Sequence, residues 1–62
     1  MARDEDLARA VAAWRSMFGD RTPRTEDELR DELFHQSSEP ANVVALVVRR
    51  HGFEAFLKAL RP

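Results

Sequence analysis

Residues 43–48 read Val43-Val44-Ala45-Leu46-Val47-Val48, and the conformation of this stretch decides the fold. Four valines favour a strand, and a continuous apolar run cannot be assigned by its period alone. The flanking residues favour a helix, because Glu39-Pro40 is typical of a first helical turn and proline there loses no needed N–H. Arg49-Arg50-His51 place positive charge where a helix ends, and Gly52 suits a left-handed cap. We therefore predict a helix that is apolar almost all round and forms the central buried element.

A second helix is predicted over residues 5–18. Its apolar residues recur at i, i+3, i+4, i+7, i+10 and i+11, which is one stripe at helical period: Leu7, Ala10, Val11, Trp14, Met17 and Phe18. Asp4 is expected to cap its start by accepting a backbone N–H, and Gly19 to end it in the left-handed conformation. Residues 19–24 then form a short loop.

The third predicted helix begins after Thr25. Thr25 and Glu28 have the spacing of a capping box, in which each side chain accepts the N–H of the other residue. The apolar side is narrow, with Leu29, Leu33 and Phe34, so this helix should lie at the surface. It must end before Pro40, and Ser37-Ser38 are suited to cap the helix that follows.

A fourth helix is predicted at the end of the chain, where apolar residues again recur at i, i+3, i+4 and i+7: Phe53, Phe56, Leu57 and Leu60. No heptad pattern persists long enough for a coiled coil. The sequence therefore predicts an all-α fold, a compact bundle of three to four short helices, as a single small helical domain over residues 1–62.

Length and composition limit the class of protein. The chain has 62 residues and no cysteine, which excludes a disulfide and a thiolate metal site and leaves self-association as a means to reinforce a thin core. No apolar run approaches the roughly 18 residues of a membrane span, and residues 1–6 are acidic where a signal peptide is basic. We expect a soluble cytoplasmic protein. Its net charge of -1 provides no global attraction for nucleic acid.

The sequence contains no recognisable catalytic, metal or cofactor motif. His35 and His51 are the only histidines, and they lack the i, i+4 spacing of a zinc-binding pair. The two glycines cannot form a phosphate-binding loop, and no serine has the surroundings of a nucleophile. We expect no enzyme activity, no cofactor, no metal and no small-molecule ligand.

Two charged clusters could bind a partner. Residues 1–38 hold six Arg and nine Asp or Glu, giving -3, and residues 39–62 hold three Arg, one Lys and two Glu, giving +2. The predicted acidic face consists of Asp27, Glu28, Asp31 and Glu32, and is either a docking face for a basic partner or simply solvated. The basic candidates for contacting phosphates are Arg49, Arg50, Lys58 and Arg61, but the last helix has few polar side chains that could contact base edges.

The apolar residues favour a protein-interaction module. Seventeen large apolar side chains lie within the four segments, and a bundle this small has little interior. We expect part of this surface to stay exposed as a protein interface, with candidates Trp14, Met17, Phe18, Phe53 and Phe56. The sequence thus predicts an adaptor, regulator or inhibitor that binds protein, either a second copy or a larger partner. The alternative is a weak nucleic-acid-binding or transcription-regulatory module that uses the basic residues of the last two helices.

Overall fold

The computed structural model describes residues 2–61, and residues 1 and 62 of the expected domain lie outside this range. Four α-helices account for most of it: α1 (Ala2–Phe18), α2 (Glu26–Gln36), α3 (Glu39–His51) and α4 (Phe53–Leu60). No strand occurs between residues 2 and 61, so the predicted all-α bundle is confirmed. Residues 43–48 lie within α3, which confirms the helical assignment of the valine-rich stretch.

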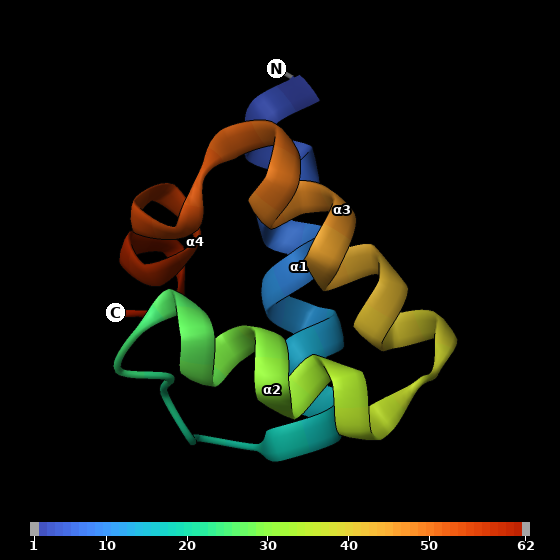
Figure 1. The fold of residues 1–62 in the computed structure, drawn as a ribbon. Helices are drawn as coiled ribbons and strands as arrows, with labels where there is room; N and C mark the ends of the chain where they lie inside the picture. Colours follow the sequence, from blue (N-terminus) through green and yellow to red (C-terminus); the bar gives the residue numbers. More distant parts are fainter. Residues whose placement is uncertain (1, 62) are drawn as a thin grey trace.

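The helices pack around α3. Its most extensive contact is with α1, and α2 and α4 also pack against it, while α4 makes a further contact with α1. Figure 1 shows α1 and α3 side by side, with α2 crossing near the C-terminal end of α1 and α4 on the other side of α1. The molecule measures 31 × 22 × 19 Å. The central position predicted for α3 is therefore confirmed.

One face of α3 is open to solvent, so the expectation that it is buried all round is wrong. Its buried residues are Ala41, Val44, Val47 and Val48. Leu46 is 56% exposed, because it lies on the opposite side of the helix from Val44 and Val48. Three neighbouring helices cover only part of the circumference of α3, and no other described element lies against the remainder.

Trp14 and Phe56 occupy the middle of the core. Their exposed fractions are 1% and 0%, and their rings meet edge-to-face with centroids 6.0 Å apart. The remaining buried hydrophobic residues are Ala10, Leu29, Leu33, Ala41, Val44, Val47, Val48 and Leu60. The core therefore draws on all four helices.

The loop between α1 and α2 is held against this core. The Trp14 indole N–H donates a hydrogen bond to the Arg21 carbonyl at 2.6 Å, and Pro23 is fully buried. A buried indole N–H needs such an acceptor, since an unpaired donor in the interior is costly. Trp14 thereby positions the loop that leads into α2.

The start of α2 matches the predicted capping box only in part. The Thr25 hydroxyl accepts the Glu28 N–H at 3.1 Å, as expected. The Glu28 carboxylate, however, accepts the N–H of Arg24 at 3.4 Å, one residue before the N–H that the motif predicts. Both interactions still satisfy N–H groups at the helix start that would otherwise lack a partner.

The serine pair between α2 and α3 serves both helices. Ser38 caps α3, with its hydroxyl accepting the Ala41 N–H at 3.4 Å. Ser37 ends α2 in the left-handed conformation, with φ of 41°, and its N–H donates to the Leu33 carbonyl. The prediction that these serines cap α3 is therefore confirmed for Ser38, while Ser37 ends the preceding helix.

The prediction for the start of α1 is wrong, whereas the prediction for its end is confirmed. Asp4 does not cap the helix, because α1 already includes Ala2 and Asp4 lies inside its first turn. There its charge still interacts favourably with the positive end of the helix dipole. Gly19 ends the helix as predicted, with φ of 67° and its N–H donating to the Arg15 carbonyl at 2.8 Å.

Candidate protein-interaction surface

Two of the five aromatic and methionine side chains predicted at an interface are in the core. Trp14 and Phe56 are fully buried, so the expectation that they are exposed is wrong. The two helices that carry them pack against each other and against α3, so each large ring fills space between helices. Periodicity places both residues on an apolar stripe but cannot distinguish a stripe that faces the core from one that faces solvent.

The other three candidates are half-buried. Met17, Phe18 and Phe53 pack against the core without being part of its fully buried centre. The Phe18 ring lies 4.2 Å from that of Trp14, and the Met17 sulfur accepts the Ser38 hydroxyl at 3.6 Å. These contacts within the chain account for much of their apolar surface, so none of them is an isolated exposed anchor.

The exposed large apolar side chains of the described part of the chain are Phe34 and Leu46, at 80% and 56%. The prediction that Phe34 belongs to the apolar side of its helix together with Leu29 and Leu33 is therefore wrong, and Leu46 is not among the predicted interface residues. Adjacent residues of a helix point about 100° apart, and at Phe34 this turns the side chain away from the core that Leu29 and Leu33 face. Periodicity alone gives no signal for this exposure, because the adjacent residues Val47 and Val48 on α3 are both buried.

Phe34 lies at the edge of a groove between α2 and α3. The groove consists of two adjoining hollows of about 400 and 340 Å³, which share Arg30, Leu33 and Ala45. The other lining residues of the two hollows are Glu26, Leu29, Phe34, Ser37, Ala41, Asn42, Val48 and Arg49. We call this surface the α2–α3 groove. Leu46 lies one helical turn after Asn42 on α3 and lines neither hollow.

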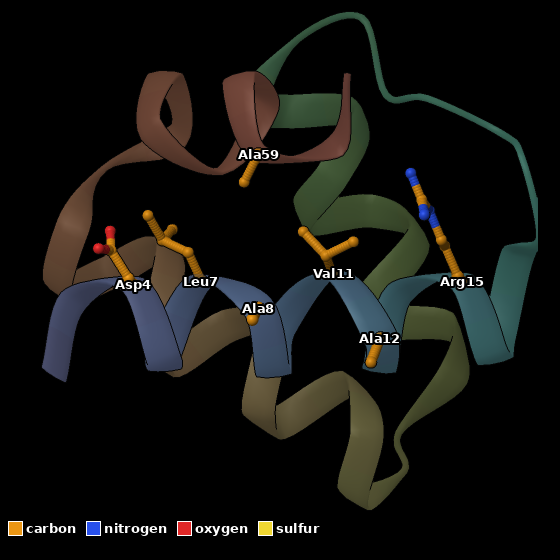
Figure 2. Close-up of a pocket in the computed structure, with 7 residues that line it drawn as sticks. All are labelled: Asp4, Leu7, Ala8, Val11, Ala12, Arg15 and Ala59. Carbon is orange, nitrogen blue, oxygen red and sulfur yellow. The ribbon is translucent and has the colours of Figure 1, made fainter. Parts of the chain in front are cut away.

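A further hollow lies between α1 and α4. Its volume is about 630 Å³, and its lining residues are Asp4, Leu7, Ala8, Val11, Ala12, Arg15 and Ala59. Figure 2 shows Leu7, Val11 and Arg15 projecting from α1 toward α4, and Ala59 projecting back. We call this surface the α1–α4 hollow. It shares no lining residue with the α2–α3 groove.

The predicted acidic face on α2 is accessible but already partly paired. Its members are Asp27, Glu28, Asp31 and Glu32, of which Glu28 and Glu32 are partly buried. Glu32 accepts a hydrogen bond from the Arg21 guanidinium at 3.0 Å, and Glu28 contributes to the cap of α2. Asp31 lies 3.8 Å from the His35 ring. Asp27 and Glu28 have no ion-pair partner among residues 2–61, and Asp31 is paired only when His35 is protonated, so Glu32 is the member whose charge is matched by an arginine.

The predicted basic residues lie on different parts of the surface. Arg49 lines the α2–α3 groove, whereas the Arg50 guanidinium lies 3.5 Å from the Asp6 carboxylate on α1. Arg61 lines a separate hollow of about 240 Å³ together with Arg15 and Arg21. Lys58 is exposed on α4. Arg49 and Arg50 have different surroundings because successive residues of α3 point in different directions.

The two histidines lie in unrelated surroundings. His51 is hydrogen-bonded to the Asp6 carboxylate at 3.0 Å, and His35 to the Asp31 carbonyl at 2.8 Å. The hydrogen bond from His51, with a smaller effect of Arg50, lowers the pKa of Asp6 below its usual 3.8. Within residues 2–61 no three His, Cys, Asp or Glu residues lie close enough to hold a metal ion. The cluster at His51 thus connects α3 to α1, whereas the contact of His35 lies within α2.

The helices and the surface of the described residues bear on what this protein does. None of the helices in the described range is long and apolar enough to cross a membrane. Phe34, at the edge of the α2–α3 groove, is a large apolar side chain that the fold does not use for its own core. No protein-family model, curated protein or solved structure matches this chain.

Proposed function

We propose that this protein is a small interaction module that binds a helical segment of another protein in the α2–α3 groove. The observation that carries the proposal is the 80% exposure of Phe34 beside a groove with an apolar floor. Grooves of this kind accept an amphipathic helix, whose apolar side chains at i, i+3, i+4 and i+7 fill them. Exposed aromatic side chains are typical anchors of protein interfaces.

Burial of Phe34 by a partner would release substantial free energy. Full burial of a phenylalanine side chain contributes about 1.5–3 kcal/mol. Among the aromatic rings of residues 2–61, the Phe34 ring pairs with that of His35, edge-to-face with centroids 6.0 Å apart. The fold gains little from this side chain, whereas a partner helix could cover it together with the floor at Leu33 and Ala45.

The charges at the rim indicate the chemistry of the partner. Arg49 lines the groove on the α3 side and has no ion pair among the described residues. Arg30 on the α2 side is already paired with Glu26 at 3.1 Å, which reduces its capacity to attract an anion. A partner helix with one acidic side chain opposite Arg49 fits this arrangement best.

The experiment is affinity capture from a lysate of the organism that encodes the protein, with matched variants. Phe34→Asp and Ala45→Asp, at two exposed lining residues of the groove, should abolish capture of a partner that the wild-type protein retains. Lys58→Asp introduces the same side chain at an exposed position on α4 that lines neither surface, and should leave capture intact. Equal capture by all four proteins contradicts the proposal, because the bound protein would then not require the groove.

Nucleic-acid binding is the second candidate function. One observation favours it: Arg15, Arg21 and Arg61 come together around one hollow. However, the Arg15 guanidinium donates to the Leu60 carbonyl at 3.0 Å, Arg21 is paired with Glu32, and Asp20 lines the same hollow. A gel shift at low salt tests this alternative, and Arg61→Ala should lower the affinity if phosphates bind there.

The proposed module acts by binding alone, without catalysis or a cofactor. As a permanent subunit of a larger assembly, the protein would bind its neighbour through the same groove. This structural role would differ from a regulatory role only in the lifetime of the complex. The proposed location is the cytoplasm, with which the lack of cysteine in the 62 residues is compatible.

A further inference from the structure

The α1–α4 hollow is a second surface with apolar lining and charged ends. Asp4 and Arg15 stand at its two ends on α1, with Leu7, Ala8, Val11 and Ala12 between them. We propose that this hollow is the interface of a symmetric dimer, in which α1 of a second copy lies antiparallel to α1. The proposal concerns a surface that the α2–α3 groove does not share, so it stands independently of the function proposed above.

The spacing of the lining residues suits a twofold axis. A symmetric dimer requires a patch that is complementary to itself. When α1 is paired with an antiparallel copy about an axis between residues 9 and 10, Asp4 stands opposite Arg15, Leu7 opposite Ala12, and Ala8 opposite Val11. All six α1 residues of the hollow therefore find their partners within the same set.

The charges select the antiparallel orientation. Two Asp4–Arg15 pairs form per dimer, about 16 Å apart at the rise of an α-helix. A parallel arrangement would instead place Asp4 against Asp4 and Arg15 against Arg15, which is repulsive. Neither residue has an ion-pair partner within the described chain, so both charges are free to pair with a second copy.

Arg15 is held in a suitable position for this pairing. One Nη atom donates to the Leu60 carbonyl at 3.0 Å, which fixes the guanidinium at the end of the hollow. Figure 2 shows the Arg15 side chain extending toward α4 on the same side as Leu7 and Val11. A guanidinium carries five N–H donors, so donors remain for a carboxylate of the second copy.

The sizes of the apolar residues permit a close helix contact. Leu7 and Val11 are half-buried, whereas Ala8 and Ala12 are exposed. In the antiparallel register each larger side chain stands opposite an alanine, so the helices can interdigitate without a clash. Ala59 on α4 forms the far wall of the hollow and would contact the second copy as well.

The test is sedimentation equilibrium from micromolar to millimolar protein with charge-exchanged variants. Wild-type protein should form a dimer that dissociates as salt is raised. Asp4→Arg or Arg15→Glu alone creates two like-charge pairs per dimer and should weaken association about tenfold or more. An equimolar mixture of the two variants restores both opposite-charge pairs, so a heterodimer should form at least as tightly as the wild-type dimer. Asp27→Arg is the matched control on α2 and should have no effect.

Three outcomes overturn the proposal. If the wild-type protein stays monomeric at every concentration, the α1–α4 hollow is not a dimer interface. A dimer that neither exchange weakens, although circular dichroism shows all variants folded, uses a different surface. If Asp4→Arg and Arg15→Glu each weaken the dimer but an equimolar mixture of the two variants does not restore it, the dimer is not paired antiparallel through Asp4 and Arg15.

Discussion

Gly52 joins α3 to α4 with φ of 94° and ψ of 153°, which lies outside the left-handed helical region expected from its position. This conformation is essentially restricted to glycine, whereas the φ of 67° at Gly19 lies where asparagine also occurs. A Cβ atom at either position would meet no atom within 4 Å, so substitution at each reports the backbone conformation alone.

Gly52→Asn should therefore destabilise the protein by about 1–3 kcal/mol, because asparagine cannot adopt this conformation without strain. Gly19→Asn is the matched control and should change the free energy of unfolding by a few tenths of a kcal/mol at most. Urea denaturation of both variants measures the difference. Equal losses at the two positions would show that the α3–α4 turn does not require the conformation described here.

Asp6 links α1 to the end of α3 through His51 and Arg50. Its pKa is lowered in the folded protein, so protonation favours the unfolded state. The stabilisation is fully present above pH 3.8, the ordinary pKa of the group, and is lost as pH falls through the lower folded-state pKa.

The melting temperature of Asp6→Asn should thus lie below that of the wild type at pH 5, and the gap should close toward pH 2. Asp20→Asn is the control, since Asp20 is exposed in the loop after α1 and has no ion-pair partner within the described chain. Thermal unfolding followed by circular dichroism at several pH values provides the measurement. A gap that does not change with pH would contradict the assigned interaction.

The start of α3 depends on Ser38, whose hydroxyl accepts the Ala41 N–H. Ser38→Ala should cost about 1 kcal/mol, because the amide would lose its partner. Ser16→Ala is the control within α1, where the hydroxyl only bonds the Ala13 carbonyl and alanine is the better helix former. Urea denaturation compares the two, and a similar loss in both would argue against a specific cap.

The helices were predictable from the sequence because their signals are local. The valine-rich stretch of α3 was assigned from Pro40 at its start and Gly52 at its end, although its residue types favour a strand. The sequence does not predict that Glu28 accepts the Arg24 N–H, because several N–H groups near a helix start compete for one side chain. It also does not predict that α1 includes Asp4, because helix boundaries vary by one or two residues.

For the whole molecule, periodicity could not determine which apolar residues are exposed. Trp14 and Phe56 fill the core because α1 and α4 meet there against α3, a contact between residues more than 40 positions apart. The groove beside Phe34 and the hollow beside Val11 likewise depend on how helices are arranged in space. The expected apolar surplus is present, but on α2 and α3 rather than at the predicted residues.

The central claim is that Phe34 belongs to a binding surface and contributes little to the fold. Urea unfolding of Phe34→Ser, followed by the fluorescence of the single tryptophan, buried Trp14, tests it most directly. Phe56→Ala serves as the core control and should lose about 3–5 kcal/mol. The free energy of unfolding of Phe34→Ser should stay within about 0.5 kcal/mol of the wild-type value, as expected at an exposed position. A loss of about 2 kcal/mol or more would show that Phe34 supports the fold, and would contradict the assignment of the α2–α3 groove as a surface left open for a partner.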